Sequence, residues 1–157
     1  MEDQNQLARR IWERFGTSLY RFCLLQMKNQ ADAEDVMQEV LCKRLWQAPA
    51  FQSEEHERRW LFRVALNQCR SEWRRSSRRE LPLEAAATQN GLEPDQLELL
   101  EQVAALPEKQ RTAIHLHYYE GYSVDEIAHI LGVTVSAVKM RLKRGREALR
   151  VELEGEV

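Results

Sequence analysis

The stretch SVDEIAHILGVTVSAVKMRLKRGREAL, from Ser123 to Leu149, predicts two short helices joined by a tight turn. Ser123, followed three residues later by Glu126, forms a capping box that marks the start of the first helix. Gly132 can adopt the left-handed backbone conformation that ends a helix, and the Thr134 hydroxyl can cap the next one. The spacing therefore predicts a helical hairpin that turns at Gly132.

The second helix of this hairpin has an apolar side that can pack on the first helix and an opposite side that is basic. At about 100° per residue, four positions share the side that packs on the first helix: Val138, Leu142, Gly145 and Leu149. The opposite side carries hydrogen-bonding and basic residues: Ser136, Lys139, Met140, Lys143 and Arg144. The alternative is an ordinary hairpin whose basic residues are only solvated. Because the cap, the turn glycine and the basic front occur together in register, we favour a helix-turn-helix that enters the major groove of DNA.

The composition is that of a globular protein. The chain has 157 residues, 43% hydrophobic and 31% charged, enough for one medium domain or two small ones. No apolar run approaches the roughly 20 residues that cross a bilayer, and the polar opening MEDQNQ is not a signal peptide, so we expect a cytoplasmic protein without membrane insertion. The three cysteines, Cys23, Cys42 and Cys69, predict neither disulfides nor a zinc motif and are interpreted as reduced thiols. His115 and His117 lie about 200° apart on a helix, so no metal and no cofactor is expected.

The net charge of −2 is unevenly distributed. Residues 56–79 hold eight arginines against two glutamates, a net of +6, and residues 139–150 hold six basic residues against one glutamate, a net of +5. The rest of the chain then carries −13. Two basic patches on an acidic body indicate a polyanion bound at two places, with acidic surfaces left for protein contacts.

The N-terminal part is predicted to be helical. A stripe of apolar residues defines the first helix: Ile11, Phe15, Leu19, Phe22 and Cys23. A break is expected from Lys28 to Gln30, followed by the helix ADAEDVMQEVLCKRLW, which Pro49 terminates. The carboxylates at its start, Asp32, Glu34, Asp35 and Glu39, are interpreted as a solvated helix start and not as a metal or acid–base site.

After the loop PAFQSEEH, a helix over ERRWLFRVALNQCRSEWRRSSRR presents two faces. The core face holds Phe62, Leu66, Cys69 and Trp73, and the other holds Trp60, Arg63, Asn67, Arg70 and Arg74. An aromatic ring, an amide and guanidinium groups in a row suit phosphates and unstacked bases. The alternative, a surface helix whose arginines lie over Trp60, stays open from composition alone.

The helical spacing of apolar residues is absent from Ser76 to Gln96, where prolines and a glycine indicate a linker. It returns in a stripe of Leu99, Leu100, Val103 and Leu106. Pro107 then fits a new helix start, and Ile114, Leu116 and Tyr118 continue the apolar content to a break at Gly121. The predicted fold is all-α, with two small helical domains joined by a flexible linker, the C-terminal one containing the helix-turn-helix. The domain limits are 1–79, a linker at 80–95, and 96–157.

Three segments, DAEDVMQEV, RRWLFRVALNQCRSEWRR and ALPEKQRTAIHLHYYEGYSVDEIAHILGVTVSAVKMRLKRGREAL, resemble in order the signature segments of extracytoplasmic-function (ECF, group 4) sigma factors of the sigma-70 family. The resemblance covers nearly the whole chain. It implies a non-enzymatic subunit, with no catalytic residues, that binds core RNA polymerase, directs it to particular promoter DNA and helps open it. It also implies an anti-sigma factor that holds the protein inactive.

The resemblance assigns roles residue by residue. Contact with core polymerase falls to Asp35, Gln38 and Glu39. Binding of the minus-ten element and the melted strand falls to Phe51, His56, Trp60, Arg63, Asn67, Arg70 and Arg74, with Phe51 and the loop to His56 near a flipped base. Reading of the minus-thirty-five element falls to Thr134, Ser136, Lys139, Met140, Arg141, Lys143 and Arg144. The helical wheel puts Arg141 on the flank, so a phosphate contact is expected there.

Three positions depart from the family pattern. Met140 stands where serine is common, Ser136 where glycine is common, and Gly145 where alanine is common. Because methionine reaches a phosphate or base edge poorly, the promoter sequence is not transferred from relatives. Gly145 costs up to about 1 kcal/mol in a helix relative to alanine, unless packing needs the space.

Two other functions are weighed against this one. A freestanding helix-turn-helix regulator would bind duplex DNA tightly by itself, and the arginine-rich helix would then be an unrelated surface. An enzyme acting on nucleic acid would need a nucleophile, base or metal constellation, which the sequence does not offer.

Overall fold

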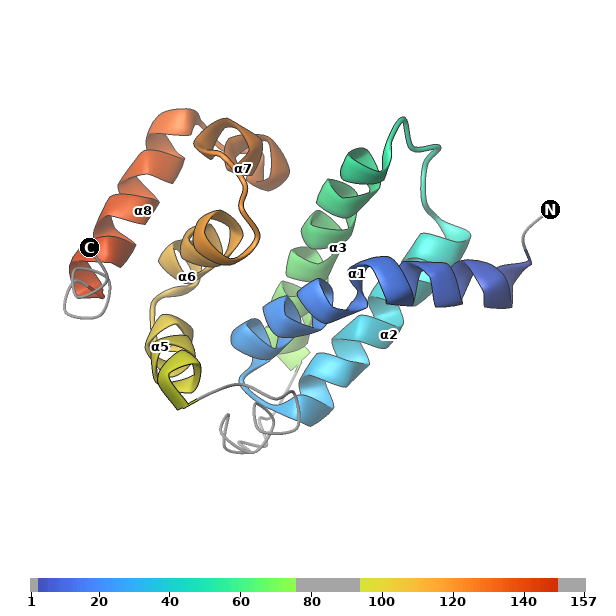
Figure 1. Cartoon of the computed structure of the whole chain (residues 1–157), viewed down its shortest axis with the longest axis horizontal. Helices are drawn as coiled ribbons and strands as arrows, with labels where there is room; N and C mark the ends of the chain where they lie inside the picture. The colour runs from blue at the N-terminus through green and yellow to red at the C-terminus, as the bar shows by residue number, and fades with distance from the viewer. Residues whose placement is uncertain (1–2, 76–93, 150–157) are drawn as a thin grey trace. The chain divides into compact units, whose positions relative to one another are not determined.

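A computed structural model describes residues 3–75 and 94–149 of the chain (Figure 1). Every regular element in these two ranges is a helix, so the all-α prediction is confirmed. The backbone divides into two compact units, Met1–Leu81 and Pro82–Val157, which we call the N-terminal and the C-terminal unit. Each unit is described by itself.

Three helices form the N-terminal unit: α1 (Gln4–Met27), α2 (Gln30–Trp46) and α3 (Glu54–Arg75). Each of them contacts the other two (Figure 1). The stripe predicted for α1 is buried, with Ile11, Phe22 and Cys23 at most 1% exposed. Phe22 meets Phe62 of α3 edge to face, with ring centroids 5.4 Å apart. Burial of these side chains is the main force that holds the three helices together.

The break between α1 and α2 lies where the sequence predicts it. Lys28 adopts a left-handed conformation with φ of 65°, and its N–H donates to the carbonyl of Leu24. Asn29 then caps α2, because its side chain accepts from the Asp32 N–H at 2.8 Å. The Asn29 amide also donates to the Asp32 carboxylate at 2.7 Å. Asp32 is buried and bonded within this cap, so its interpretation as a solvated carboxylate was wrong.

The start of α3 differs from the prediction. The loop was expected to run through His56, but the helix begins at Glu54. Ser53 caps it, because its hydroxyl accepts from the His56 N–H at 3.0 Å and its carbonyl accepts from the Glu57 N–H at 3.1 Å. Glu54 and Glu55 add negative charge near the positive end of the helix dipole. His56 therefore lies in the first turn of α3 and not in a loop.

The C-terminal unit contains α5 (Pro94–Ala104), α6 (Glu108–Ile114), the π-helical turn η1 (His115–Tyr119), α7 (Val124–Leu131) and α8 (Val135–Ala148). Helix α8 contacts α6 and α7. Residues 76–93, which hold most of the predicted linker, lie outside the described residues. The described chain resumes with α5 at Pro94, inside the stretch predicted to connect the domains.

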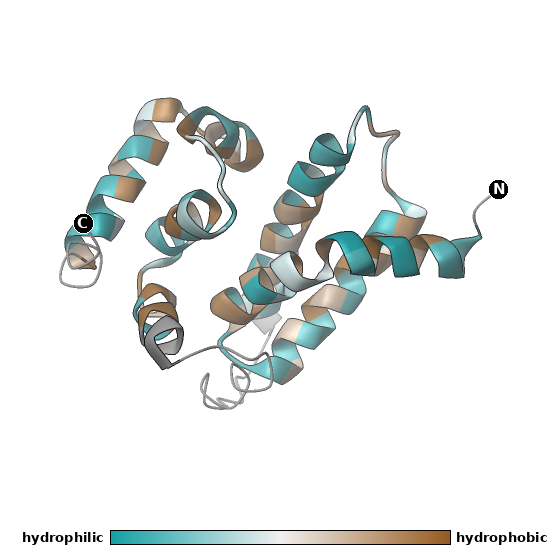
Figure 2. Ribbon diagram, in the orientation of Figure 1, coloured by the Kyte–Doolittle hydropathy of each residue, from teal (hydrophilic) through white to brown (hydrophobic). Residues whose placement is uncertain are grey.

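The helical hairpin predicted for residues 123–149 is formed by α7 and α8. Ser123 and Glu126 form the predicted capping box, with bonds of 2.9 and 3.2 Å. Gly132 ends α7 with a left-handed φ of 68°, and the Thr134 hydroxyl accepts from the Ala137 N–H at 3.0 Å at the start of α8. Hydrophobic and hydrophilic segments alternate along α8 in Figure 2, as an amphipathic helix requires.

Helix α6 continues into the wide turn η1, in which the Glu120 N–H donates to the His115 carbonyl at 3.2 Å. The side chains of the same two residues are buried, and His115 Nε2 lies 2.8 Å from Glu120 Oε2. Tyr118 was predicted to continue the apolar content that begins at Ile114, but it is 46% exposed. The reason is the π turn, which breaks the spacing of four residues that would put both on one face.

Gly145 lies where α8 crosses α6. An added Cβ would stand 2.6 Å from Cγ1 of the buried Ile114, so packing needs the missing side chain. We expect Gly145→Ala to lower the free energy of unfolding of the C-terminal unit by about 1 to 2 kcal/mol, because overpacking exceeds the gain in helix propensity. Hydrogen exchange of α6 and α8 amides measures it.

Gly16 in α1 provides the matched control. A Cβ there would meet the ring of Trp12 at 3.0 Å, and Trp12 is 51% exposed and can move. Gly16→Ala is expected to stabilise the N-terminal unit by up to about 1 kcal/mol. Equal effects of the two substitutions would contradict this account of Gly145.

The three cysteines are free thiols with different surroundings. Cys23 and Cys69 are buried in the core of the N-terminal unit, and Cys42 is exposed on α2. A hydrogen bond with Cys69, together with burial, raises the pKa of the Cys23 thiol well above its usual range. Because the thiolate is the reactive form, Cys23 is inert in the folded protein.

Thiol labelling tests this arrangement. Native protein treated with a maleimide at pH 7.5 is expected to gain one adduct, on Cys42, and unfolded protein three, as read by mass spectrometry. The variant Cys42→Ser should gain none while folded. Native labelling of Cys23 or Cys69 at the rate of Cys42 would show that the core is open.

Candidate nucleic-acid interface

Helix α8 separates a buried stripe from an exposed basic surface. Val138, Leu142, Gly145 and Leu149 are buried, as the spacing predicts. The residues predicted to face outward are all exposed, and we call this set the α8 front: Ser136, Lys139, Met140, Lys143 and Arg144. Arg141 is half-buried between the two, which agrees with its predicted place on the flank. The α8 front is thus open to a polyanion along the length of the helix.

Two residues near the α8 front, Arg146 and Tyr118, were not predicted to belong to a site. Arg146 of α8 is exposed, and its Nη1 lies 3.4 Å from the hydroxyl of Tyr118 on η1. The His117 and Tyr118 rings meet edge to face, with centroids 4.9 Å apart. The contact between Arg146 and Tyr118 could not be predicted, because the spacing of residues around Tyr118 does not indicate a π turn.

Helix α3 also presents the two faces that were predicted. Phe62, Leu66 and Cys69 are buried, and Trp73 is half-buried with its indole N–H donating to the Gln26 carbonyl at 3.1 Å. The other face holds exposed Arg63, Asn67 and Arg74 and half-buried Trp60 and Arg70. Three guanidinium groups, an amide and an indole therefore follow one another along a single helix.

An aromatic cluster stands at the start of this face. It consists of Phe51, which precedes α3, and of His56 and Trp60 on the first turns of α3. The Phe51 ring meets the His56 ring at 5.3 Å and the Trp60 ring at 5.6 Å, edge to face in both cases. The Gln52 N–H donates to His56 Nδ1 at 3.2 Å, which leaves the proton of the neutral ring on Nε2. The structure thus brings together three residues that the sequence assigned to one site.

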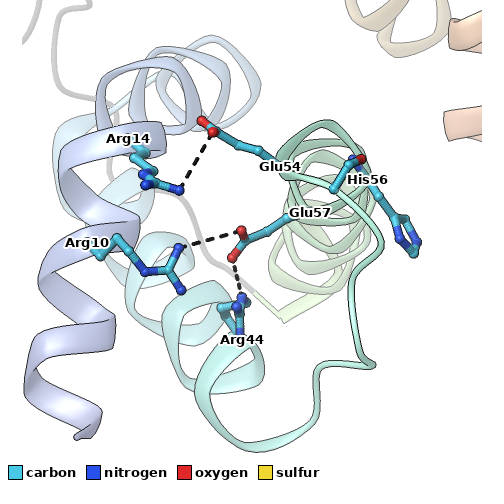
Figure 3. Close-up of polar contacts among 7 residues, drawn as sticks. Arg10, Arg14, Arg44, Glu54, His56 and Glu57 are labelled. Carbon is cyan, nitrogen blue, oxygen red and sulfur yellow. Dashed lines mark hydrogen bonds and ion pairs between the residues drawn. The ribbon is translucent and has the colours of Figure 1, made fainter. Parts of the chain in front are cut away.

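Ion pairs beneath this cluster tie the three helices together (Figure 3). The Glu57 carboxylate of α3 lies 2.7 Å from Arg44 Nε of α2 and 3.8 Å from Arg10 Nη1 of α1. Its side chain is only 6% exposed. A more exposed pair, Arg14 with Glu54 at 3.6 Å, joins α1 to α3 nearby. Local sequence spacing does not indicate the role of Glu57, because its partners come from other helices.

Helix α2 carries an exposed stripe of acidic and apolar side chains. Asp35, Gln38 and Glu39, the residues predicted to meet a protein partner, are all exposed. At 100° per residue, Asp35, Glu39, Cys42 and Trp46 fall within about 60° of one another, and we call these four the α2 stripe. Trp46 is 71% exposed. The stripe therefore passes from acidic at its start to apolar at its end.

The described residues do not form a metal site. In residues 3–75 and 94–149, no group of three or more His, Cys, Asp or Glu side chains is placed to hold a metal ion. His117 Nδ1 lies 2.8 Å from the Tyr122 carbonyl, whereas His115 pairs with Glu120, so the two histidines serve separate contacts. None of the helices described here has the length and apolar character needed to span a membrane.

A basic helix-turn-helix in one unit and an arginine-rich aromatic face in the other are the features expected of a protein that binds nucleic acid. Comparison with known families gives the class more closely. Residues 11–79 match sigma-70 region 2, and residues 96–149 match sigma-70 region 4. The chain belongs to the ECF sigma factors of the sigma-70 family.

Curated relatives and solved structures agree with this assignment. The ECF RNA polymerase sigma factor SigL of Mycobacterium tuberculosis is 31% identical, covering 94% of this chain and 89% of SigL. SigW of Bacillus subtilis is also 31% identical, covering 96% and 90%. CnrH, solved with the cytosolic domain of CnrY, is 26% identical with a TM-score of 0.69 over 99% of this chain and 92% of CnrH. The sigma factor RpoE of Bartonella quintana, solved with the anti-sigma factor NepR, shares the fold at 22% identity and the same TM-score, over 93% and 98%.

Proposed function

We propose that this sigma factor binds core RNA polymerase, directs it to particular promoters and helps open the DNA there. The observation that carries the proposal is the pair of unlike nucleic-acid surfaces, one suited to duplex DNA and one to unstacked bases. Residues 1–79 would form the region 2 domain, 80–95 a linker and 96–157 the region 4 domain. The protein would act in the cytoplasm without catalytic activity of its own.

The C-terminal unit would read the minus-thirty-five element in the major groove. Its contacts would come from Thr134, Ser136, Lys139, Met140, Arg141, Lys143 and Arg144. The α8 front is exposed and rigidly backed by Val138 and Leu142, which supports base-edge contacts from Lys139, Met140 or Lys143. Arg141 on the flank is better placed for a phosphate.

The N-terminal unit would bind the minus-ten element and the melted strand. The residues proposed for this surface are Phe51, His56, Trp60, Arg63, Asn67, Arg70 and Arg74. Aromatic rings offer stacking faces to unpaired bases, and the arginines that follow on α3 offer positive charge to the backbone. The aromatic cluster is the strongest support, because it joins the three residues by direct ring contacts.

The α2 stripe would dock on core polymerase. Asp35 and Glu39 would supply the acidic part of the contact, Gln38 beside the stripe an amide, and Trp46 an apolar anchor at the end of the stripe. The exposure of a tryptophan at 71% supports this, because large apolar side chains left on a surface mark binding sites.

An inhibitory partner is also proposed. CnrH, to which this chain is similar over nearly its whole length, was solved with a second protein bound. The sigma factor RpoE, which shares the fold, was solved with the anti-sigma factor NepR, and we infer that an anti-sigma factor binds this protein and holds it inactive. Affinity purification of the chain from its native host under non-inducing conditions tests this, and recovery of core polymerase with no second partner would contradict it.

Transcription in vitro tests the main function. Core polymerase with this protein and a promoter library is expected to yield transcripts from a narrow set of promoters, and core polymerase alone should not. Binding of the free protein to the selected promoters should be weak. Tight, specific duplex binding by the free protein, with no effect on core polymerase, would favour a freestanding regulator instead.

Lys139→Ala is expected to weaken binding of the holoenzyme to the selected minus-thirty-five element about fivefold to thirtyfold, because each base-edge contact is worth roughly 1 to 2 kcal/mol. Lys109→Ala, which removes an exposed lysine from α6, is the control and should change affinity less than twofold. Both are measured at one salt concentration, because phosphate contacts depend on salt. Unchanged affinity and promoter preference for Lys139→Ala would contradict the assignment.

A further inference from the structure

The guanidinium group of Arg44 makes two contacts, one through its edge and one through its plane. Its Nε donates to Glu57 Oε2 at 2.7 Å, and its central carbon lies 4.8 Å from the centroid of the Phe51 ring. Side-chain exposure is 12% for Arg44 and 6% for Glu57, so both charges are largely removed from water. An arginine can pair at its edge and stack with its plane at once, which a lysine cannot do.

The Glu57 carboxylate fixes this arginine in place. It belongs to the first turns of α3, directly after His56 and three residues before Trp60. Figure 3 shows Glu57 directed toward Arg10 and Arg44, while His56 points away on the outer side of the helix. The same turn of α3 therefore carries an ion pair on its inner side and the aromatic cluster on its outer side.

Phe51 is in consequence held from two directions. His56 and Trp60 contact its ring edge to face, and Arg44 lies over the ring. Three such neighbours restrict the positions that the ring can take before any ligand arrives. Preorganisation of this kind raises affinity, because the cost of ordering the side chain is met on folding and not on binding.

We propose that Arg44, oriented by Glu57, positions Phe51 for capture of an unstacked promoter base, so that this buried ion pair sets both the ease of opening and the base preference at one minus-ten position. The inference deepens the proposed function and rests on it. Arg44 and Glu57 are positioning residues, since they act on the base through Phe51. A purely structural tie between α2 and α3 would affect stability but not base preference.

A double-mutant cycle tests the coupling. Phe51→Ala, Arg44→Met and the double variant are each assembled with core polymerase on a promoter chosen from the library. Opening is followed with 2-aminopurine placed in the melted segment, and base preference with a library randomised over the minus-ten element. Arg44→Met is expected to slow promoter opening about tenfold, because it removes a desolvated cation–π contact with Phe51. Arg44→Met should weaken the base preference at the same promoter position as Phe51→Ala. The double variant should open the promoter no more slowly than Phe51→Ala.

Two further variants separate positioning from stability. Arg10→Met removes the other partner of Glu57, 3.8 Å away, and is expected to leave base preference unchanged. Arg44→Lys keeps a positive charge beside Glu57 but loses the planar group over Phe51. Arg44→Lys should fold even where Arg44→Met does not. It should still weaken the base preference at the same minus-ten position.

The outcomes are distinct. Additive effects of Arg44→Met and Phe51→Ala, or an unchanged base preference in Arg44→Lys, would overturn the positioning role while the wild-type protein still selects promoters. If the wild-type protein selects none, the proposed function fails and this inference with it. Relaxed preference at one shared position, with no further loss in the double variant, supports it.

Discussion

Glu57→Ala is expected to lower the free energy of unfolding of the N-terminal unit by about 3 kcal/mol. The substitution leaves the guanidinium of Arg44, only 12% exposed, without the carboxylate 2.7 Å away, and it also removes a partner of Arg10. An unpaired charge buried in this way costs more than the pair contributes when intact. The lower end of the usual range applies, because Arg44 retains some access to water.

Urea unfolding followed by tryptophan fluorescence measures this effect selectively. The four tryptophans, Trp12, Trp46, Trp60 and Trp73, all belong to the N-terminal unit. Glu54→Ala is the matched control on the same turn of α3. Its partner Arg14 and Glu54 itself are 47% and 59% exposed, so its effect should stay below about 1 kcal/mol. Equal losses for the two substitutions would mean that burial does not decide the strength of the Glu57 pairs.

Trp46→Ala is expected to weaken binding to core polymerase by about thirtyfold or more, which corresponds to roughly 2 kcal/mol. Tryptophan residues that anchor an interface commonly carry this much of its energy, and Trp46 ends a stripe whose other members are acidic or small. The loss would appear mainly as faster dissociation. Competition against a labelled sigma factor for core polymerase gives the affinity.

Trp12→Ala provides the control, because Trp12 is also exposed, at 51%, but lies on α1. It should change the affinity for core polymerase less than twofold. A similar loss from both substitutions would indicate a general effect of removing surface tryptophan, and no loss from Trp46→Ala would remove this residue from the docking surface.

Local features of the fold could be predicted from the sequence because each depends on neighbours in the chain. The capping box at Ser123, the left-handed Gly132 and the buried stripe of α8 follow from spacing within one or two turns. The break at Lys28 was predicted in the same way. The boundary of α3 was missed because Ser53, which caps it, lay inside a segment interpreted as loop.

Contacts between helices could not be predicted in this way. Glu57 was counted only as a charge to set against the arginines, since nothing local indicates that Arg10 and Arg44 reach it. Asp32 was interpreted as solvated, although the cap of its own helix buries it. The candidate site was predicted as a set of residues, and the ring contacts around Phe51 required the tertiary structure.

The wide turn at His115–Tyr119 bears on which changes of length the chain tolerates. A π turn holds one residue more than an α turn for nearly the same rotation about the helix axis. Deleting one residue here and restoring α-helical bonding would therefore leave Tyr122 and the start of α7 close to their present direction, whereas a deletion inside α6 would turn them by about 100°. Loss of a single residue should be better tolerated between His115 and Tyr119 than within α6, where the contact of Ile114 with α8 would also move.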